Sequence, residues 1–380
     1  MRKNVKKQLA LRVLSTAALV AMVSSIATAA FADTYDLNTG SVTVETKANG
    51  ITYVTQKDDK QVDGFARNKN NEVLNEHPDD TGVTITSDGK QTSNTITVET
   101  AKDQTTDVTL DKVHIEVNTS EAKSGAIEIK GDGDTNLELN GDNTVLVKND
   151  WEEEHAAIEK ADKYGKEGTL TIKDDVNDDG SEKTGTEADT TGKLLAGGFH
   201  QAAAIGGGGT SDTACTSNIK ITGGEITASG GVYGAGIGGG AYGAGTNIRI
   251  EGNADVTAFA GGGAAIGSGY QSSYDSDITI TDHATVDAAS ENGCGIGQGL
   301  NASGKATITI SGNASVNAEV FNMPAAIGSH SSSATVNIED HADVTAVGFG
   351  VAIGTGSGHG GTSTVINITG GTVNAVTRSN

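Results

Sequence analysis

The chain is poor in cysteine and in proline, with two of each among its 380 residues. Two cysteines exclude the disulfide framework on which many small exported folds depend. In the repeat described below, Cys215 and Cys294 are separated by about three coils, or about 14 Å at about 4.8 Å per coil, whereas a disulfide needs Cα atoms within about 7 Å. We therefore expect two free, buried thiols. The scarcity of proline favours a fold in which most backbone N–H groups pair strands.

Basic residues are also scarce, because 26 lysines and arginines stand against 49 aspartates and glutamates, for a formal net charge of −23. Nucleic acid is recognised through lysine and arginine contacts to phosphate, so this charge argues against a nucleic-acid partner. It favours cations instead, calcium among them in an extracellular setting.

Long apolar runs are absent except at the start of the chain. Residues 1–32 predict a signal peptide, since a basic segment precedes an apolar run over 13–30 and the small residues around Ala32 suit cleavage after it. No later stretch approaches the roughly 18–20 apolar residues that span a bilayer. We expect a secreted or cell-surface protein with no membrane span. Without the signal peptide, 21 basic and 49 acidic residues leave a charge of −28.

The chain contains a repeat centred on the dipeptide Ile-Gly. The dipeptide recurs every 26 to 32 residues with small neighbours, at Ile205, Ile237, Ile266, Ile296, Ile327 and Ile353. After each comes an alternating apolar pair: Ile219/Ile221, Ile248/Ile250, Ile278/Ile280, Ile308/Ile310, Val336/Ile338 and Ile366/Ile368. A further β-branched residue follows at Ile226, Val256, Val286, Val316, Val344 and Val373.

Three short period-two segments in a unit of about 30 residues predict an all-β fold, a right-handed parallel β-helix with three short strands per coil. We expect an N-terminal β cap over 33–80, irregular coils over 81–199 with an acidic insertion at 174–192, and regular glycine-rich coils over 200–380. The last coil ends at Asn380, so either the chain was cut from a longer protein or this open end pairs with a partner.

The turn after the second strand of each coil carries Asn253, His283, Asn313 or His341, or two glycines. These residue types share tolerance of positive φ. We expect a left-handed corner at that position, which leaves the two histidines without a catalytic role.

The glycines of the repeat suggest a bare face. If Ile266 points inward, Ala265, Gly267 and Gly269 point outward, and the neighbouring coils do the same. Such a face fits tight bends, packing against a second copy of the chain, or a ligand lying on the backbone.

Aromatic residues form only 4% of the chain, so their positions are informative. Seven of them lie in the irregular segments beside the Ile-Gly elements, where flat rings could stack on a sugar chain or merely cover the core ends. The predicted ligand-binding residues are Tyr233, Tyr242, Phe259, Tyr270, Tyr274, Phe321 and Phe349.

The acidic insertion matches the first half of a calcium loop. Asp175, Asn177 and Asp179 alternate before Gly180, which predicts oxygen ligands for a metal. The twelfth position is Thr186 rather than an acid, so a solvated acidic loop and a weak calcium site both remain open.

We find no catalytic residues. Glycoside hydrolysis needs two placed carboxylates, and no such pair is evident on adjacent coils. Gly358-His359-Gly360 is of the type seen in polygalacturonases but lacks the accompanying aspartates and basic motif, and only Arg249 and Arg378 could serve as a lyase base after residue 200. We expect a protein that is not an enzyme.

The repeat, clearest at 204–228 and 352–376, resembles repeats in exported surface proteins of clostridia and related Gram-positive gut bacteria. It is also similar to clostridial parallel β-helix proteins that bind calcium and plant polysaccharides. The resemblance implies this architecture and a general binding role. Two functions follow as expectations: polysaccharide binding, with calcium assistance for an anionic glycan, or a structural or adhesive role in which the glycine face or the open end binds copies of the chain or other surface proteins.

Overall fold

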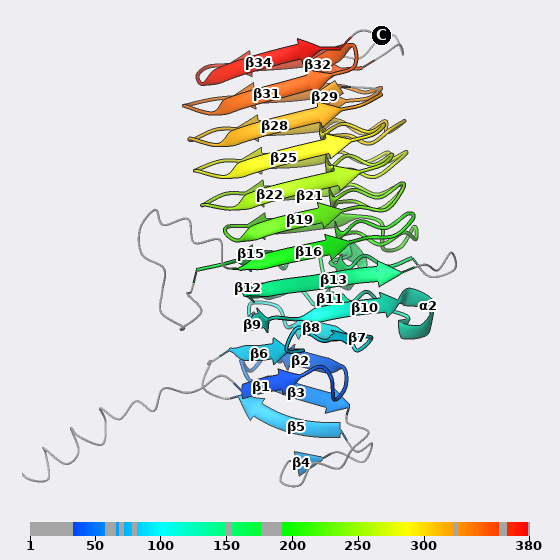
Figure 1. Ribbon diagram of the computed structural model, residues 1–380, viewed down its shortest axis with the longest axis vertical. Coiled ribbons are helices and arrows are strands. Elements are labelled where there is room, and N and C mark those ends of the chain that lie inside the picture. Colours follow the sequence, from blue (N-terminus) through cyan, green and yellow to red (C-terminus); the bar gives the residue numbers. More distant parts are fainter. Residues whose placement is uncertain are drawn as a thin grey trace, which may run out of the picture. The chain divides into compact units, whose positions relative to one another are not determined.

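The short alternating segments form strands that pair in parallel with the equivalent segment of the next coil, as Figure 1 shows. The computed structural model describes residues 33–57, 66–67, 72–77, 82–148, 154–175, 192–322, 325–356 and 363–378. The predicted signal peptide lies outside these residues. The prediction of an all-β parallel β-helix with three strands per coil is confirmed.

The strands build three sheets, each running the length of the solenoid. Sheet A contains β1 (Asp33–Asp36), β6 (Val83–Thr86), β9 (Thr105–Asp111), β12 (Asp134–Asn140), β15 (Leu170–Lys173), β18 (Thr216–Ile221), β21 (Gly245–Ile250), β24 (Ser276–Ile280), β27 (Ala306–Ile310), β30 (Ala334–Ile338) and β33 (Thr364–Ile368). Sheet B contains β4 (Ala66–Arg67), β5 (Glu72–His77), β3 (Thr52–Lys57), β2 (Val42–Thr46), β8 (Ile96–Thr100), β11 (Ile127–Lys130), β14 (Ile158–Glu159), β17 (Ile205–Gly206), β20 (Ile237–Gly238), β23 (Ile266–Gly267), β26 (Ile296–Gly297), β29 (Ala325–Ser329) and β32 (Val351–Thr355). Sheet C contains β7 (Gln91–Thr92), β10 (His114–Asn118), β13 (Asp142–Lys148), β16 (Lys193–Gly197), β19 (Glu225–Ser229), β22 (Asp255–Ala260), β25 (Thr285–Ser290), β28 (Ser315–Val320), β31 (Asp343–Gly348) and β34 (Thr372–Thr377).

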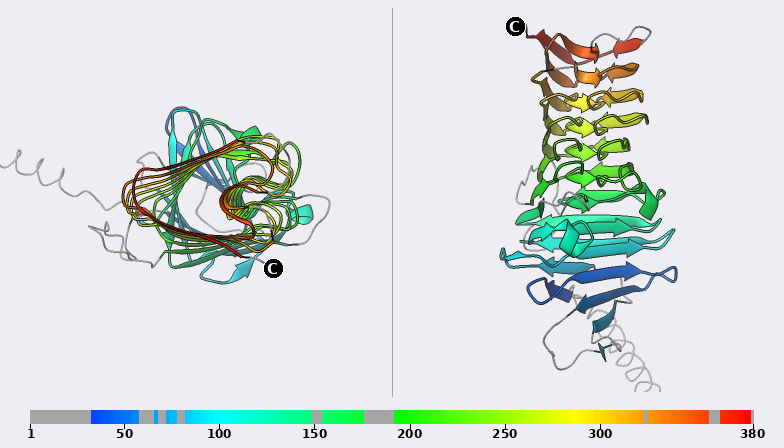
Figure 2. Two further views of the ribbon diagram at one scale, coloured as in Figure 1. Left: turned by 90° about the horizontal axis from the view of Figure 1, so that it is seen from above. Right: turned by 90° about the vertical axis from the view of Figure 1, so that its right-hand side faces the viewer.

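The core consists of columns of stacked aliphatic side chains. Seen from above, the coils lie over one another (Figure 2), and the strand register places Ile278 on Ile308 and Ile308 on Val336. These side chains are fully buried, while the residues between them along each strand face outward. Each coil thus buries apolar surface that it could not bury alone, which is the physical reason for the repeat.

Two helical segments interrupt the coils. The α-helix α2 (Thr119–Ala122) begins at Asn118, whose side chain accepts a hydrogen bond from Ser120 N at 3.1 Å, and ends at Lys123 in the left-handed conformation. The 3₁₀ helix η1 spans Asp162–Tyr164. Among the described residues no helix is long and apolar enough to cross a membrane.

The segment 33–80, predicted as a cap, contributes to two sheets. β1 lies beside β6 at the end of sheet A, and β2 pairs in parallel with β8. β3 and β5 then turn back as antiparallel strands at the edge of sheet B. Sheet B therefore ends in antiparallel strands at this edge, whereas its other strands pair in parallel.

The left-handed corner between sheets A and C exists, but its predicted position is wrong by one residue. Positive φ falls on Gly252, Asp282, Gly312 and Asp340, at 67°, 60°, 66° and 56°. The residues that follow, such as His283, have already rejoined the ladder, because His283 N donates to Gly252 O of the coil before.

Glycine and aspartate alternate at this corner from one coil to the next. The Asp282 carboxylate accepts a hydrogen bond from Gly252 N, and the Asp340 carboxylate accepts one from Gly312 N, both at 3.1 Å. These side-chain bonds therefore link the corners two by two, the corner of Gly252 with that of Asp282 and the corner of Gly312 with that of Asp340.

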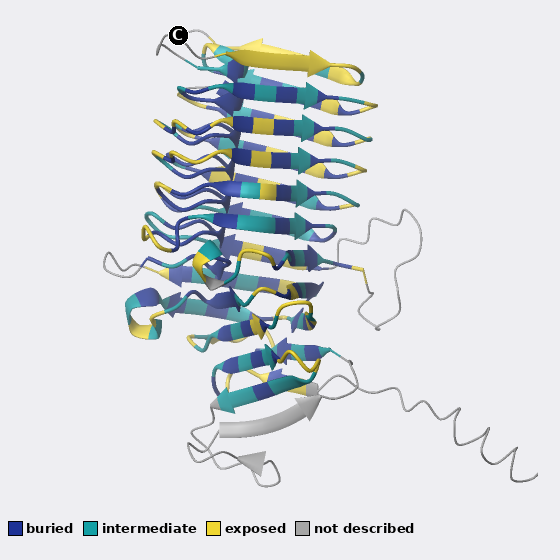
Figure 3. Ribbon diagram, turned by 180° about the vertical axis from the view of Figure 1, so that it is seen from behind, coloured by how far each residue is buried: buried dark blue, intermediate teal, exposed yellow. Residues whose placement is uncertain are grey.

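The coil at the C-terminal end is open. β33 is exposed along its length, and Figure 3 shows the contrast with the coils beneath it. Ile366 and Ile368 are 43% and 53% exposed, although the same positions of the inner coils are fully buried.

The two cysteines are free thiols, as predicted; Cys294 is buried and Cys215 is half-buried. Burial raises the pKa of the Cys215 thiol, and burial raises that of Cys294 from an ordinary value of 9.0 to about 12. Both folded-state values lie above those of an unfolded chain, so the stability gained from keeping the thiols neutral is complete below about pH 8.5. For Cys294 it is lost as the pH rises toward 12.

At pH 8 we expect a colorimetric thiol reagent to modify Cys215 slowly and Cys294 only after unfolding, because a buried neutral thiol is a poor nucleophile. Counting thiols before and after adding guanidinium chloride measures this. A Cys215→Ser variant then gives no reacting thiol until it unfolds. Rapid modification of that variant in the folded state would contradict the burial of Cys294.

Candidate functional site

Each Ile-Gly strand of sheet B lies between two loops. We call the loop that precedes the strand the first arm and the loop that follows it the second arm. In the coil of Ile266 the first arm ends at Ala264, whose N–H donates to the carbonyl of Ser268 in the second arm at 2.9 Å. The same closing bond forms in the coils of Ile205, Ile237 and Ile296. The chain thus makes a tight loop around each Ile-Gly pair.

The prediction of a bare, outward glycine face is wrong. Residues 263–269 are all buried, so Ala265 and Gly267 do not face solvent. Gly267 has φ +136°, and an added Cβ would collide with the carbonyl oxygen of Gly297 on the next coil. Positive φ breaks the two-residue alternation on which the prediction rested, and backbone of the neighbouring coil fills the space that glycine leaves. Of the three interpretations, the structure supports tight bends.

The arms bring three of the predicted aromatic residues together with one histidine. The ring centroids of Tyr233 and Tyr270 are 5.0 Å apart, those of Tyr242 and Tyr270 are 6.4 Å apart, and His200 packs edge-on to Tyr233 at 5.4 Å. We call these four residues the aromatic cluster. Tyr233 is 37% and Tyr242 51% exposed, so the cluster presents ring surface to solvent.

Backbone pairing between arms fixes this cluster. Tyr233 N donates to His200 O at 2.7 Å, Tyr270 N donates to Tyr233 O at 2.9 Å, and Tyr242 N donates to Tyr270 O at 2.7 Å. Because consecutive rings stand on main-chain atoms bonded to one another, their spacing is set by the solenoid. Such preorganisation reduces the ordering cost of binding a ligand.

The other predicted aromatic residues lie apart. Among the described residues, no ring contact joins Phe259, Tyr274, Phe321 or Phe349 to the cluster, although Tyr274 is 57% exposed. Sequence reasoning missed His200, because a lone histidine before Gln201 and three alanines carries no periodic signal.

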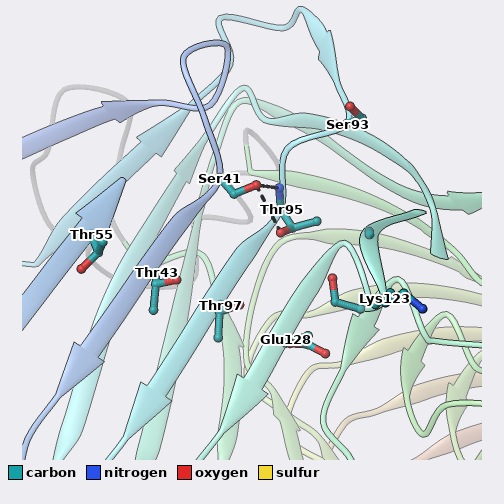
Figure 4. Close-up of a pocket in the computed structure, with 10 residues that line it drawn as sticks. Ser41, Thr43, Thr55, Ser93, Thr95, Thr97, Lys123 and Glu128 are labelled. Carbon is teal, nitrogen blue, oxygen red and sulfur yellow. Dashed lines mark hydrogen bonds between the residues drawn. The ribbon is translucent and has the colours of Figure 1, made fainter. Parts of the chain in front are cut away.

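A polar groove of about 420 Å³ lies along sheet B in the N-terminal coils. Thr55, Thr43, Thr97 and Glu128 line it from adjacent strands, and Figure 4 shows them in a row. Lys123 lies at its edge, and the remaining lining residues are Ser41, Ser93, Thr95, Ala122 and Ser124. Seven of its ten lining residues carry hydroxyl groups, so the groove suits a ligand that exchanges many hydrogen bonds.

Two coils carry glutamate where later coils carry glycine. Glu128, which lines the groove, pairs with Glu159 of the next coil, and Glu159 pairs with Gly206, so the three share one buried position of sheet B. The sequence itself indicates this replacement of glycine by glutamate. At 126–127 and 157–158, Ala-Ile is a degenerate copy of the glycine motif, and glutamate follows it.

The expectation that no carboxylates stack on adjacent coils is wrong. The register stacks Glu128 on Glu159, Glu45 on Glu99 and Glu225 on Asp255. Burial withdraws Glu159 from solvent, and Lys193 pairs with Glu225 at 2.8 Å. Burial, followed by the charges of Glu225 and Asp287, raises the pKa of Asp255.

Of the predicted calcium ligands, Asn177 and Asp179 lie outside the described residues. Asp175 is described, and its carboxylate accepts a hydrogen bond from Lys173 Nζ at 2.8 Å. Burial raises the pKa of Asp175, but hydrogen bonds with Glu138 and Lys173 outweigh it and leave the pKa lowered. Calcium at this loop would compete with Lys173.

Comparison with known proteins supports the architecture. Residues 219–241 and 248–270 match the model of a family described as Beta helix repeat. The chain is a parallel β-helix repeat protein. The two matched segments include β19, β20, β22 and β23 together with Tyr233 and Tyr270 of the aromatic cluster. No curated protein and no solved structure matches the chain.

Proposed function

We propose that this protein is a secreted or cell-surface, non-catalytic binding protein that recognises polysaccharide through the aromatic cluster. The observation that carries the proposal is the continuous row of Tyr233, Tyr270 and Tyr242, whose rings are in contact across adjacent arms and partly exposed. Aromatic rings with a polar end suit ligands that are apolar on one side and hydrated on the other, and the flat faces of sugar rings have this character.

The polar groove supports the same proposal. It belongs to sheet B, as do the strands between the arms, and its hydroxyl groups match the hydrogen-bonding needs of a sugar chain. The net charge of −23 would repel an anionic glycan, so calcium would be needed to bridge the two, whereas a neutral glycan would need no cation.

Calorimetric titration with polygalacturonate and with a neutral β-glucan, each with and without calcium, tests the proposal. We expect binding of one polymer by residues 33–380. A Tyr242→Ala/Tyr270→Ala double variant should weaken it by at least about 30-fold, because losing two stacking rings costs about 1 kcal/mol or more each. Tyr274→Ala is the matched control, since Tyr274 is more exposed yet lies outside the cluster, and it should bind as the unaltered protein does.

An equal loss in both variants would contradict the assignment to the cluster. The alternative function is a structural or adhesive one, in which the chain binds copies of itself or other surface proteins. No heat with either polymer, together with a concentration-dependent dimer in sedimentation, would support that function instead.

A further inference from the structure

The outer face of sheet B is open over its first strands and covered beyond them. One row of side chains runs along this face in register, at Thr55, Thr43, Thr97, Glu128 and Glu159. The threonines are half-buried, whereas Glu128 is 4% and Glu159 is 0% exposed. An added Cβ on Gly208 would lie 2.7 Å from Glu159 Oε2, so the second arm of the Ile205 coil covers Glu159. The polar groove therefore ends at Glu128.

The floor of the groove offers hydroxyl groups that the other lining residues do not use. Thr95 N donates to Ser41 Oγ at 3.0 Å, and among the residues drawn in Figure 4 no hydrogen bond reaches Thr43, Thr55 or Thr97. Strand pairing holds these three threonines about 4.8 Å apart from one strand to the next. Because the main chain fixes their spacing, the hydroxyl groups are preorganised for a ligand that exchanges several hydrogen bonds.

An aromatic ring lies beside this row of hydroxyl groups. Tyr53 and Thr55 are on β3, and Val54 between them is fully buried, so both neighbours face outward. Tyr53 pairs in register with Glu45, as Thr55 does with Thr43. A ring next to hydroxyl groups suits a sugar unit, because a sugar has an apolar face as well as hydroxyl groups of its own.

Carboxylates line the same face. In the next row, Glu45 pairs in register with Glu99, and Glu99 pairs with Lys130. Lys130 binds Glu128 Oε2 at 2.6 Å, which leaves Glu128 Oε1 as an acceptor. A hydroxyl group of a neutral sugar would donate to that oxygen, whereas Glu128 and Glu99 would repel the carboxylate of a uronic acid. Lys123, at the edge of the groove, already has another interaction, so it is not a free cation for an anionic ligand.

We propose that the groove binds an uncharged sugar unit of the polysaccharide and that Glu128 excludes a uronic acid, which rests on the proposed function and narrows its ligand to a neutral glycan. The aromatic cluster begins two coils beyond Glu128, since β11 pairs with β14 and β14 pairs with β17. Contacts at both places on one glycan chain strengthen binding, because the second contact forms at a high effective concentration.

Short oligosaccharides separate the groove from the aromatic cluster. Calorimetric titration uses residues 33–380 carrying Tyr242→Ala/Tyr270→Ala, with a neutral β-gluco-oligosaccharide and an oligogalacturonate of equal length, both without calcium. We expect one neutral oligosaccharide per chain. The oligogalacturonate should bind at least about 10-fold more weakly, because its carboxylates meet like charge.

Thr43→Val/Thr97→Val, made in the same chain, should weaken binding of the neutral oligosaccharide by about 10-fold, because two hydrogen bonds to the ligand are lost. The matched control is Thr279→Val/Thr309→Val. These two threonines are also half-buried and also pair in register, but on the outer face of sheet A, so their replacement should leave binding unchanged.

Glu128→Gln keeps the side-chain size and removes the charge. It should raise the affinity for the oligogalacturonate by about 10-fold, whereas a merely structural role would lower the affinity for both ligands. Glu225→Gln is the matched control, since Glu225 also pairs with a lysine, Lys193, at 2.8 Å but lies on sheet C. It should not change the ratio of the two affinities.

Unchanged binding in Thr43→Val/Thr97→Val, or equal affinity for the two oligosaccharides, would overturn the assignment of the groove. The polymer titrations test the aromatic cluster separately. Polymer binding that depends on Tyr242 and Tyr270, with no oligosaccharide bound at the groove, would leave the proposed function standing and overturn this proposal alone. Oligosaccharide bound at the groove, with polymer binding indifferent to the two tyrosines, would overturn the role of the cluster alone.

Discussion

Replacing Gly267 with alanine should destabilise the protein by about 2–6 kcal/mol. The residue has φ +136°, which costs an L residue about 1–3 kcal/mol. An added Cβ would also collide with the backbone of Gly297 on the next coil, and overpacking of this kind costs typically a further 1–3 kcal/mol. Backbone cannot move aside as a flexible side chain can, so the coils must separate locally. Thermal unfolding followed by far-ultraviolet circular dichroism measures the loss.

Gly350→Ala is the matched control for that prediction. Gly350 also has positive φ, at +102°, but nothing lies within 4 Å of an added Cβ. Only backbone strain remains, so we expect a cost of about 1–3 kcal/mol. Equal destabilisation by the two variants would show that the close approach of neighbouring coils at Gly267 is unimportant.

Truncating a column of the core should be the other large effect. Ile308 is fully buried between Ile278 and Val336, so Ile308→Ala removes apolar contact with both neighbouring coils and leaves a cavity. We expect a loss of about 2–5 kcal/mol. Because a solenoid can lose coils locally, the full unfolding profile in denaturant should be recorded rather than a single midpoint.

Ile366→Ala makes the same chemical change in the same column. Ile366 pairs with Val336 on one side and is 43% exposed in the last coil. With less surface to lose and no enclosed cavity, it should cost about 1 kcal/mol. A loss as large as that of Ile308→Ala would contradict the view that stacking on both sides determines the energy.

The core was predictable from sequence because its signal is periodic. Inward isoleucine and valine recur at fixed offsets, and the register pairs Ile278 with Ile308 and Val286 with Val316 as the spacing indicates. Side chains that alternate between two faces can be assigned without coordinates whenever every residue is in an ordinary extended conformation.

The glycine face was not predictable by that rule. Positive φ at Gly267 interrupts the alternation, and nothing in the letters Ala-Ile-Gly says which way the backbone turns. The corner was misplaced for a related reason. Asparagine and histidine tolerate positive φ, yet the preceding glycine or aspartate adopts it.

The candidate site residues were also predictable only in part. The sequence pointed to Tyr233, Tyr242 and Tyr270 because they flank the repeat, and the contacts between arms bring these three together and leave Tyr274 apart. It did not predict that Glu128 lies against Glu159, because these residues meet only through the pairing of adjacent coils. Stacking across coils is invisible to any window shorter than one coil.

The paired corners have a consequence for how such a chain can change its length. Asp282 bonds back to Gly252, and Asp340 bonds back to Gly312. Duplicating or losing a single coil would place aspartate over aspartate, which repel, or glycine over glycine, which leaves an amide without its acceptor. Changes of two coils, close to 60 residues, preserve every corner bond. In this part of the solenoid the corner hydrogen bonds therefore repeat every two coils, whereas the apolar column repeats with every coil.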